Sequence, residues 1–104
     1  MANYVLVYSG GGMPETEAEQ NAVIAAWGAW YEGLGQAVVD GGNPFGPSTS
    51  VAADGTVSQG APPALSGYTV ISADSLDAAT EQAKSCPIRA SGGRADVYET
   101  FQIM

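Results

Sequence analysis

The chain has 104 residues, with 11 Asp and Glu against 3 Lys and Arg and no His, so its formal net charge is −8. This length predicts one domain spanning 1–104. The negative charge argues against nucleic acid and anionic membrane surfaces as partners, because both are bound through clustered Lys and Arg. Without His, a Ser-His-Asp triad, a Cys-His pair and a His-ligated metal are excluded within one chain, and we expect neither a metal nor a cofactor.

Composition also bears on location and assembly. The N-terminal residues run into the apolar segment 4–8 without a preceding basic region, and no apolar run approaches the ~18 residues of a spanning helix. The single cysteine, Cys86, cannot form an intrachain disulfide. We therefore expect a cytoplasmic protein. Charged residues make up 13% of the chain and hydrophobic residues 45%, a low ratio for a monomer, so we expect a second subunit to cover part of the surface.

The first predicted elements are a strand and a long helix. Residues 3–8 are rich in β-branched and aromatic side chains and are followed by Ser-Gly-Gly-Gly, which predicts a strand and a turn. Thr16 and Glu19 have the spacing of a capping box, so the helix begins near residue 15. Its apolar face follows the helical period and comprises Val23, Trp27, Trp30, Tyr31, Leu34 and Val38. The sequence Gly-Gly-Asn-Pro at 41–44 ends this helix.

Residues 41–67 are rich in Gly and Pro and predict a hairpin with flanking loops. Strands are expected at 49–53 and 56–58. The Asp54-Gly55 pair between them favours a two-residue primed turn, because both central positions of such a turn need positive φ.

The last part of the chain predicts a strand, a helix and a strand. Residues 67–73 have β character, and Asp74 or Ser75 caps a helix that continues to Lys84. Its inward face comprises Leu76, Ala79 and Ala83. Pro87 stops this helix, and residues 95–103 alternate as a strand with Val97, Glu99 and Phe101 on one face.

This order predicts an α+β protein of the ferredoxin-like βαββαβ type with an antiparallel sheet. In that fold both helices cover one face of the sheet and leave the other bare. The strands at 3–8 and 67–73 nevertheless carry apolar residues on both faces. We therefore expect two subunits to pack their bare faces together as an isologous homodimer.

Three stretches of the chain belong together: Tyr-Val-Leu-Val-Tyr at 4–8, the succession Gly-Tyr and Ala-Asp-Ser-Leu-Asp-Ala-Ala within 66–79, and Cys-Pro, Gly-Gly and Val-Tyr-Glu within 83–99. Taken together, they resemble the YCII-related family, including its DGPF branch. The resemblance covers nearly the whole chain and implies a dimeric α+β barrel. It implies little about chemistry, because most members have no established reaction.

The chain departs from the family in two places. The founding branch has a proposed His-Asp pair, whereas this chain has no His and offers only Asp40 as a positional match for the Asp. The DGPF branch is named for a tetrapeptide that is replaced here by Gln-Gly-Ala-Pro at 59–62.

Several residues are candidates for a site. Trp27 and Tyr31 are either core residues or the lining of a pocket. Glu99, on an apolar face, is either buried with a raised pKa, paired with an Arg, or solvated at the rim of the sheet. Asp40 and Asn43 form either a polar cluster or a turn with side chain to backbone hydrogen bonds. Glycines 10–12 offer backbone N–H groups, yet three nearby Glu residues disfavour an anion and indicate a plain turn.

These residues support three hypotheses. The first is a homodimer that binds a small organic molecule in a pocket of each subunit, with Glu99 or Asp40 as a possible proton acceptor and Tyr98 or Tyr31 as hydrogen-bond donors. Trp27 and Asn43 complete the expected ligand site. The second is a non-catalytic assembly or regulatory module that contacts another protein. The third, cofactor-free oxygenase chemistry, rests on fold analogy alone. For Cys86, its position before a proline at a helix end indicates an inert, packed thiol.

Overall fold

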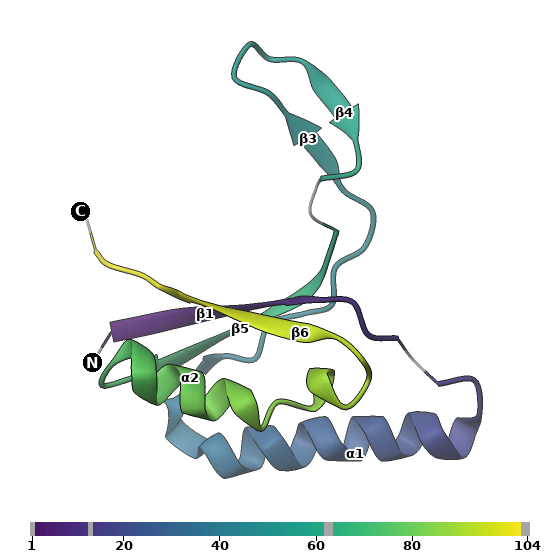
Figure 1. The fold of residues 1–104 in the computed structure, drawn as a ribbon, viewed down its shortest axis with the longest axis vertical. Coiled ribbons are helices and arrows are strands. Elements are labelled where there is room, and N and C mark those ends of the chain that lie inside the picture. The colour runs from purple at the N-terminus through teal and green to yellow at the C-terminus, as the bar shows by residue number, and fades with distance from the viewer. Residues whose placement is uncertain (1, 13, 62–63, 103–104) are drawn as a thin grey trace.

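Within residues 2–12, 14–61 and 64–102, which the computed structural model describes, the chain forms a four-stranded antiparallel sheet with two α-helices on one of its faces (Figure 1). The elements in chain order are β1 (Ala2–Ser9), α1 (Glu17–Leu34), the 3-10 helix η1 (Gly35–Ala37), β2 (Val38–Asp40), β3 (Thr49–Val51), β4 (Val57–Gln59), β5 (Leu65–Ala73), α2 (Leu76–Lys84), the 3-10 helix η2 (Pro87–Arg89) and β6 (Arg94–Glu99). The predicted α+β class with an antiparallel sheet is confirmed.

Both α-helices begin at predicted caps. Thr16 Oγ1 accepts a hydrogen bond from the Glu19 N–H at 3.2 Å, and Ser75 Oγ accepts one from the Ala78 N–H at 3.1 Å. Each bond satisfies an N–H that has no partner inside the helix. Of the two caps that the sequence allowed for α2, Asp74 and Ser75, the structure uses Ser75.

The first helix is shorter than predicted. It ends at Leu34, and Gly35 follows with a φ of 57° and donates its N–H to the Tyr31 carbonyl oxygen. A glycine with positive φ is a common helix stop, because a side chain there would be strained. Val38 therefore lies in β2. The expectation that the helix continues to Val38 and ends at 41–44 is wrong.

The sheet order is β2-β5-β1-β6, and its register assigns each side chain to a face. Leu6 lies opposite Thr69 of β5 and Val97 of β6, and directly opposed residues of antiparallel strands share a face. These residues face the helices. The other face, which we call the open face, carries Val5, Val7, Tyr68, Val70 and Tyr98.

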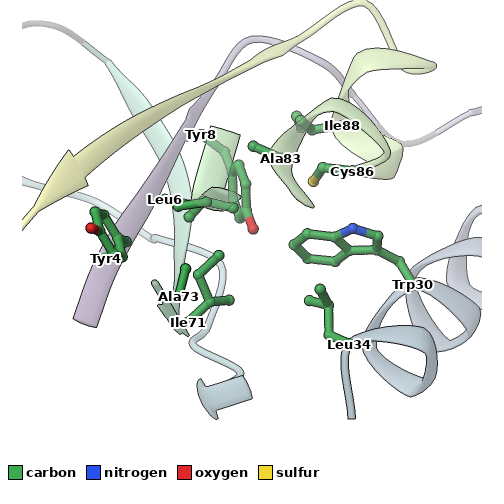
Figure 2. Close-up of a cluster of buried hydrophobic side chains, with 11 residues drawn as sticks. Tyr4, Leu6, Tyr8, Trp30, Leu34, Ile71, Ala73, Ala83, Cys86 and Ile88 are labelled. Carbon is green, nitrogen blue, oxygen red and sulfur yellow. The ribbon is translucent and has the colours of Figure 1, made fainter. Parts of the chain in front are cut away.

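The core lies between the helices and the sheet. Figure 2 shows Trp30 and Leu34 of α1 facing Leu6 and Ile71 of the sheet. The Trp30 indole N–H donates to the Gln82 carbonyl oxygen of α2 at 3.1 Å. One buried side chain thus joins both helices to the sheet.

Two predictions about the second half of the chain need correction. Ala79 and Ala83 of α2 are buried as predicted, but Leu76 is 45% exposed, because it is the first residue of α2 and lies outside the contact that the two alanines make. The last strand ends at Glu99, and Phe101 beyond it is 82% exposed. Residue 103 of the expected strand lies outside the described residues.

A hairpin forms at the predicted place, but its first strand ends at Val51 instead of residue 53 and its turn differs. The Gly55 N–H donates to Ala52 O at 2.9 Å and the Ala52 N–H donates to Thr56 O at 2.8 Å, which leaves a three-residue loop. Among the described residues only glycines have positive φ, and Gly55 has a φ of 91°. Asp54 instead accepts the Thr56 N–H at 2.9 Å. The primed turn is therefore wrong, and the loop matches a type I turn followed by a glycine bulge.

This hairpin stands away from the sheet, on the side opposite the helices (Figure 1). Strands β3 and β4 pair with each other and, within the described ranges, with no other strand. At their base the Gly60 N–H donates to Ser48 O at 2.8 Å. We call residues 48–60 the β-arm.

Candidate functional site

A cavity of about 460 Å³ lies at the end of the sheet from which the β-arm departs. Its walls come from the middle of α1, the end of β1 and the loop after it, the loop after β2, the start of β5, and η2 with the turn after it. The described residues that line it are all uncharged: Tyr8, Gly10, Gly11, Gly12, Val23, Ile24, Trp27, Tyr31, Gly41, Gly42, Asn43, Pro44, Ser66, Gly67, Tyr68, Ile88 and Ser91. The volume is within the range of about 300–1,000 Å³ that is usual for small-molecule sites.

Aromatic rings form one wall of the cavity. The ring of Trp27 meets that of Tyr8 edge to face, with centroids 5.3 Å apart and planes at 72°. Tyr31, one helical turn further along α1, lies 5.9 Å from Trp27 with its plane tilted by 34°. Edge-to-face and tilted contacts of this kind are favourable between aromatic rings, so the three rings form one continuous aromatic wall.

A buried hydrogen-bond network lies behind this wall. The Tyr8 hydroxyl donates to Thr69 Oγ1 at 2.7 Å, and the Tyr31 hydroxyl lies 3.0 Å from the same atom. Tyr31 also donates to the Gly41 carbonyl oxygen at 2.9 Å. Thr69, which is fully buried, therefore joins strand β5 to β1, to α1 and to the loop after β2.

The buried titratable groups beside the cavity are neutral near pH 7. Burial raises the pKa of the Tyr8 hydroxyl above its ordinary value of 10.0. Burial also raises the pKa of the Cys86 thiol above its ordinary value of 9.0. Cys86 is packed in the core at 2% exposure, as the sequence indicated. Neither group can act as a base at neutral pH, because its charged form is the one that burial disfavours.

The loop after β2 is held by the turn that the sequence offered as an alternative to a polar cluster. Asp40 Oδ1 accepts the Gly42 N–H at 2.8 Å. Gly42 has a φ of 74°, and a Cβ there would run into the Tyr68 carbonyl oxygen of β5. Only glycine allows the loop to lie this close to the sheet. The loop then presents Asn43 to the cavity.

The structure brings together half of the predicted site residues. Trp27, Tyr31 and Asn43 all line the cavity. Tyr98 does not line it, because it lies opposite Val5 on the open face, away from the end of β1 at which Tyr8 meets the cavity. Glu99 lies two residues beyond Val97, on the same helix-facing side of β6. It lies opposite Tyr4, toward the end of β1 that is far from the cavity.

Neither candidate carboxylate lines the cavity. Glu99 is exposed to solvent, which matches the third of its three alternatives, and Asp40 is engaged by the Gly42 N–H. Within the described ranges, no group of three or more Cys, Asp or Glu side chains gathers closely enough to hold a metal ion.

Sequence reasoning missed two important members of the site. Thr69 alternates with Gly67 and Ile71 on the buried face of β5, and a polar residue at such a position must find hydrogen-bond partners. A polar residue at a buried position of an alternating strand is a signal that could have identified Thr69 from the sequence. Tyr8 was assigned to the first strand, but its role depended on which residues of α1 and β5 it would meet.

Ser66 is a further feature of this end of β5. It lines the cavity, and its hydroxyl oxygen is buried without a hydrogen-bond partner among the described residues. An unsatisfied buried hydroxyl costs about 1–3 kcal/mol. A ligand group that reached this oxygen would recover part of that cost.

Comparison with family models, curated proteins and solved structures finds no significant match to this chain. No helix in the described part of the chain combines the length and apolar character that crossing a membrane requires.

Proposed function

We propose that the protein binds a small, uncharged organic molecule with a flat apolar body in this cavity. The observation that supports this most directly is the lining, which combines aromatic rings with glycine-rich backbone and has no charged side chain among the described residues around it. Apolar walls with a few polar groups are typical of sites that recognise small molecules. A chain with a net charge of −8 also repels anionic ligands.

The proposed activity is binding and not acid–base catalysis. A general base must come within hydrogen-bond reach of the proton it removes. Asp40 is occupied by the Gly42 N–H, Glu99 lies outside the lining, and burial raises the pKa of the Tyr8 hydroxyl. The alternative function is a non-catalytic assembly or regulatory module that contacts another protein, and the exposed β-arm favours it.

We also propose that two copies pack their open faces together as a ferredoxin-like, dimeric α+β barrel. With the β-arm set aside, the order of strands and helices and the sheet order β2-β5-β1-β6 agree with that fold. The chain exposes 7,019 Å², whereas a monomer of this mass exposes about 5,400 Å². The excess, about 1,600 Å², is what one partner contributes to a large homodimer interface.

Membership of the YCII-related family is part of the same proposal. The segments that carry the resemblance coincide with β1, β5, α2 and β6, so they form three of the four strands of the sheet and its second helix. We propose a cytoplasmic location, in keeping with a chain whose single thiol is buried and unpaired.

A neutral fluorescent probe, N-phenyl-1-naphthylamine, tests the binding proposal. We expect its emission to rise on addition of the protein, and we expect the anionic probe 1-anilinonaphthalene-8-sulfonate to bind less tightly. Val23→Trp fills the cavity from α1 and should weaken binding of the neutral probe about tenfold or more, a loss of about 1.4 kcal/mol.

Ala25→Trp provides the matched control, because Ala25 is exposed on the same helix and does not line the cavity. It should bind the probe like the parent protein. Equal affinities in Val23→Trp and the parent protein would refute the cavity as the binding site.

A further inference from the structure

We infer that the β-arm crosses to a second copy of the chain and packs its Val51–Val57 face against Tyr98 and Phe101 of that copy. This inference rests on the dimer proposed above and adds to it a second contact region outside the two sheet faces.

The arm lacks support within its own subunit. Val51 and Val57 are directly paired across the hairpin and are 67% and 60% exposed. A two-stranded hairpin without further packing is marginally stable in water. Asp54, in the turn, is the one charged residue in 48–60. Two exposed valines on a hairpin that carries one charge and has no support in its own subunit form a small apolar surface of the kind that marks an interaction site.

The root of the arm is nevertheless well fixed. The Phe45 N–H donates to Ser66 O at 2.9 Å, and its ring stacks on that of Tyr68 with centroids 5.6 Å apart and planes at 18°. Pro44 and Gly67 form an additional β-bridge. The arm therefore has a defined direction, away from the helices and toward the space where the second sheet would lie (Figure 1).

Two exposed aromatic side chains lie in and just after β6, toward the other end of the sheet. Tyr98 is 59% exposed and Phe101 is 82% exposed. Tyr98 belongs to the open face, and the chain beyond β6 rises on the same side of the sheet as the arm, at the opposite end (Figure 1).

Two-fold symmetry brings the arm of one copy to Tyr98 and Phe101 of the other. A two-fold axis that lies between the sheets, perpendicular to the strands, brings the arm of each copy to the Tyr98 and Phe101 end of the other. Each copy then gives and receives the same contact, as an isologous dimer requires. The extended shape agrees with this arrangement, because the radius of gyration is 15.2 Å where a compact chain of this length has about 13 Å.

Cysteine cross-linking tests the contact. In a Cys86→Ala background, Val57→Cys and Phe101→Cys chains are mixed and oxidised. We expect disulfide-linked dimers that contain one chain of each kind, and little cross-linking when either chain is oxidised alone, because a disulfide needs Cα atoms within about 7 Å. Ala25→Cys, which is exposed on α1 and does not line the cavity, is the control and should cross-link to neither.

Charge substitutions test the energetic role of the arm. Val51→Asp/Val57→Asp should raise the dissociation constant of the dimer about tenfold or more, while Ser58→Asp, on the other face of β4, should change it less than about threefold. Circular dichroism should show the same fold in all three proteins, because the substituted side chains lie outside the protomer core.

Three results would overturn the inference. One is efficient cross-linking of Val57→Cys with itself, which would place the arms beside each other. Another is a sedimenting dimer that forms no mixed disulfide. The third is a monomer at micromolar concentration, which would also remove the proposed dimer. Binding of the neutral probe to the cavity is measured separately, so each failure is distinguishable from a failure of the ligand proposal.

Discussion

Replacement of Thr69 by Val tests whether the network behind the cavity stabilises the fold. Valine has nearly the shape of threonine, so the substitution removes hydrogen bonds and leaves the packing almost unchanged. Thr69 is 0% exposed and accepts the Tyr8 hydroxyl at 2.7 Å. Its Oγ1 also lies 3.2 Å from the Gly41 carbonyl oxygen, to which it can donate. In the variant, the Tyr8 hydroxyl loses its acceptor while remaining buried.

The expected destabilisation follows from these contacts. An orphaned buried hydroxyl costs about 1–3 kcal/mol, and the lost bond to Gly41 contributes about 1 kcal/mol. We therefore expect Thr69→Val to lower the free energy of unfolding by about 2–4 kcal/mol. Urea denaturation at fixed protein concentration measures this, and the midpoint should fall by about 1 M or more, given slopes of about 1–3 kcal/mol/M.

The double variant Tyr8→Phe/Thr69→Val separates the network from simple packing. Removing the Tyr8 hydroxyl removes the group that Thr69→Val orphans. The two changes together should therefore cost at least about 1 kcal/mol less than the sum of the single changes. Additivity within about 0.5 kcal/mol, or a Thr69→Val protein as stable as the parent, would refute the role of this network.

Three further predictions concern pH, capping and salt. Because burial raises the pKa of Cys86 and of Tyr8 above 9.0 and 10.0, unfolding releases protons at high pH. In urea titrations, stability should fall as the pH rises above about 9, by up to about 1.4 kcal/mol per pH unit for each group. Cys86→Ala should remove the first part of this alkaline loss. Thr16→Ala should cost about 1 kcal/mol in the same assay, and Thr16→Asn should restore most of it. Raising the salt concentration should tighten the proposed dimer in sedimentation experiments, because it screens repulsion between two chains of charge −8.

Local signals predicted most of the secondary structure. Thr16 and Ser75 cap their helices because a hydroxyl at that position satisfies an exposed N–H wherever it occurs. The predicted end of α1 was wrong because Val38 continues the apolar period of the helix by coincidence. Gly35 was the available signal, since a glycine just after the last periodic residues is a frequent helix stop.

The turn of the β-arm illustrates a choice that composition leaves open. Asp-Gly suits a primed turn, in which both residues have positive φ, and also a type I turn with a bulge, in which only the glycine does. The Asp54 side chain accepts the Thr56 N–H, and this local bond accompanies the second form. The sequence is compatible with both turns, and the hydrogen bonds between the two strands determine which of them forms.

The candidate site was predictable to the extent that it depends on one helix. Trp27 and Tyr31 share a face of α1, so their joint appearance in the cavity follows from the helical period. The prediction that Tyr98 and Glu99 join Trp27 and Tyr31 in one site was wrong. Alternation shows which residues of a strand share a face, but not which end of the neighbouring strand they meet. That information comes from the register of β6 on β1.

The cavity and the root of the β-arm share the same residues, which links ligand binding to assembly. Pro44, Ser66 and Tyr68 line the cavity. Pro44 also bridges to Gly67, and Tyr68 stacks on Phe45 at the root of the arm. A ligand that shifted this loop would shift the arm as well. Since such coupling is reciprocal, a neutral probe that binds more tightly to the dimer must also tighten the dimer by the same factor, and sedimentation with and without the probe measures that factor directly.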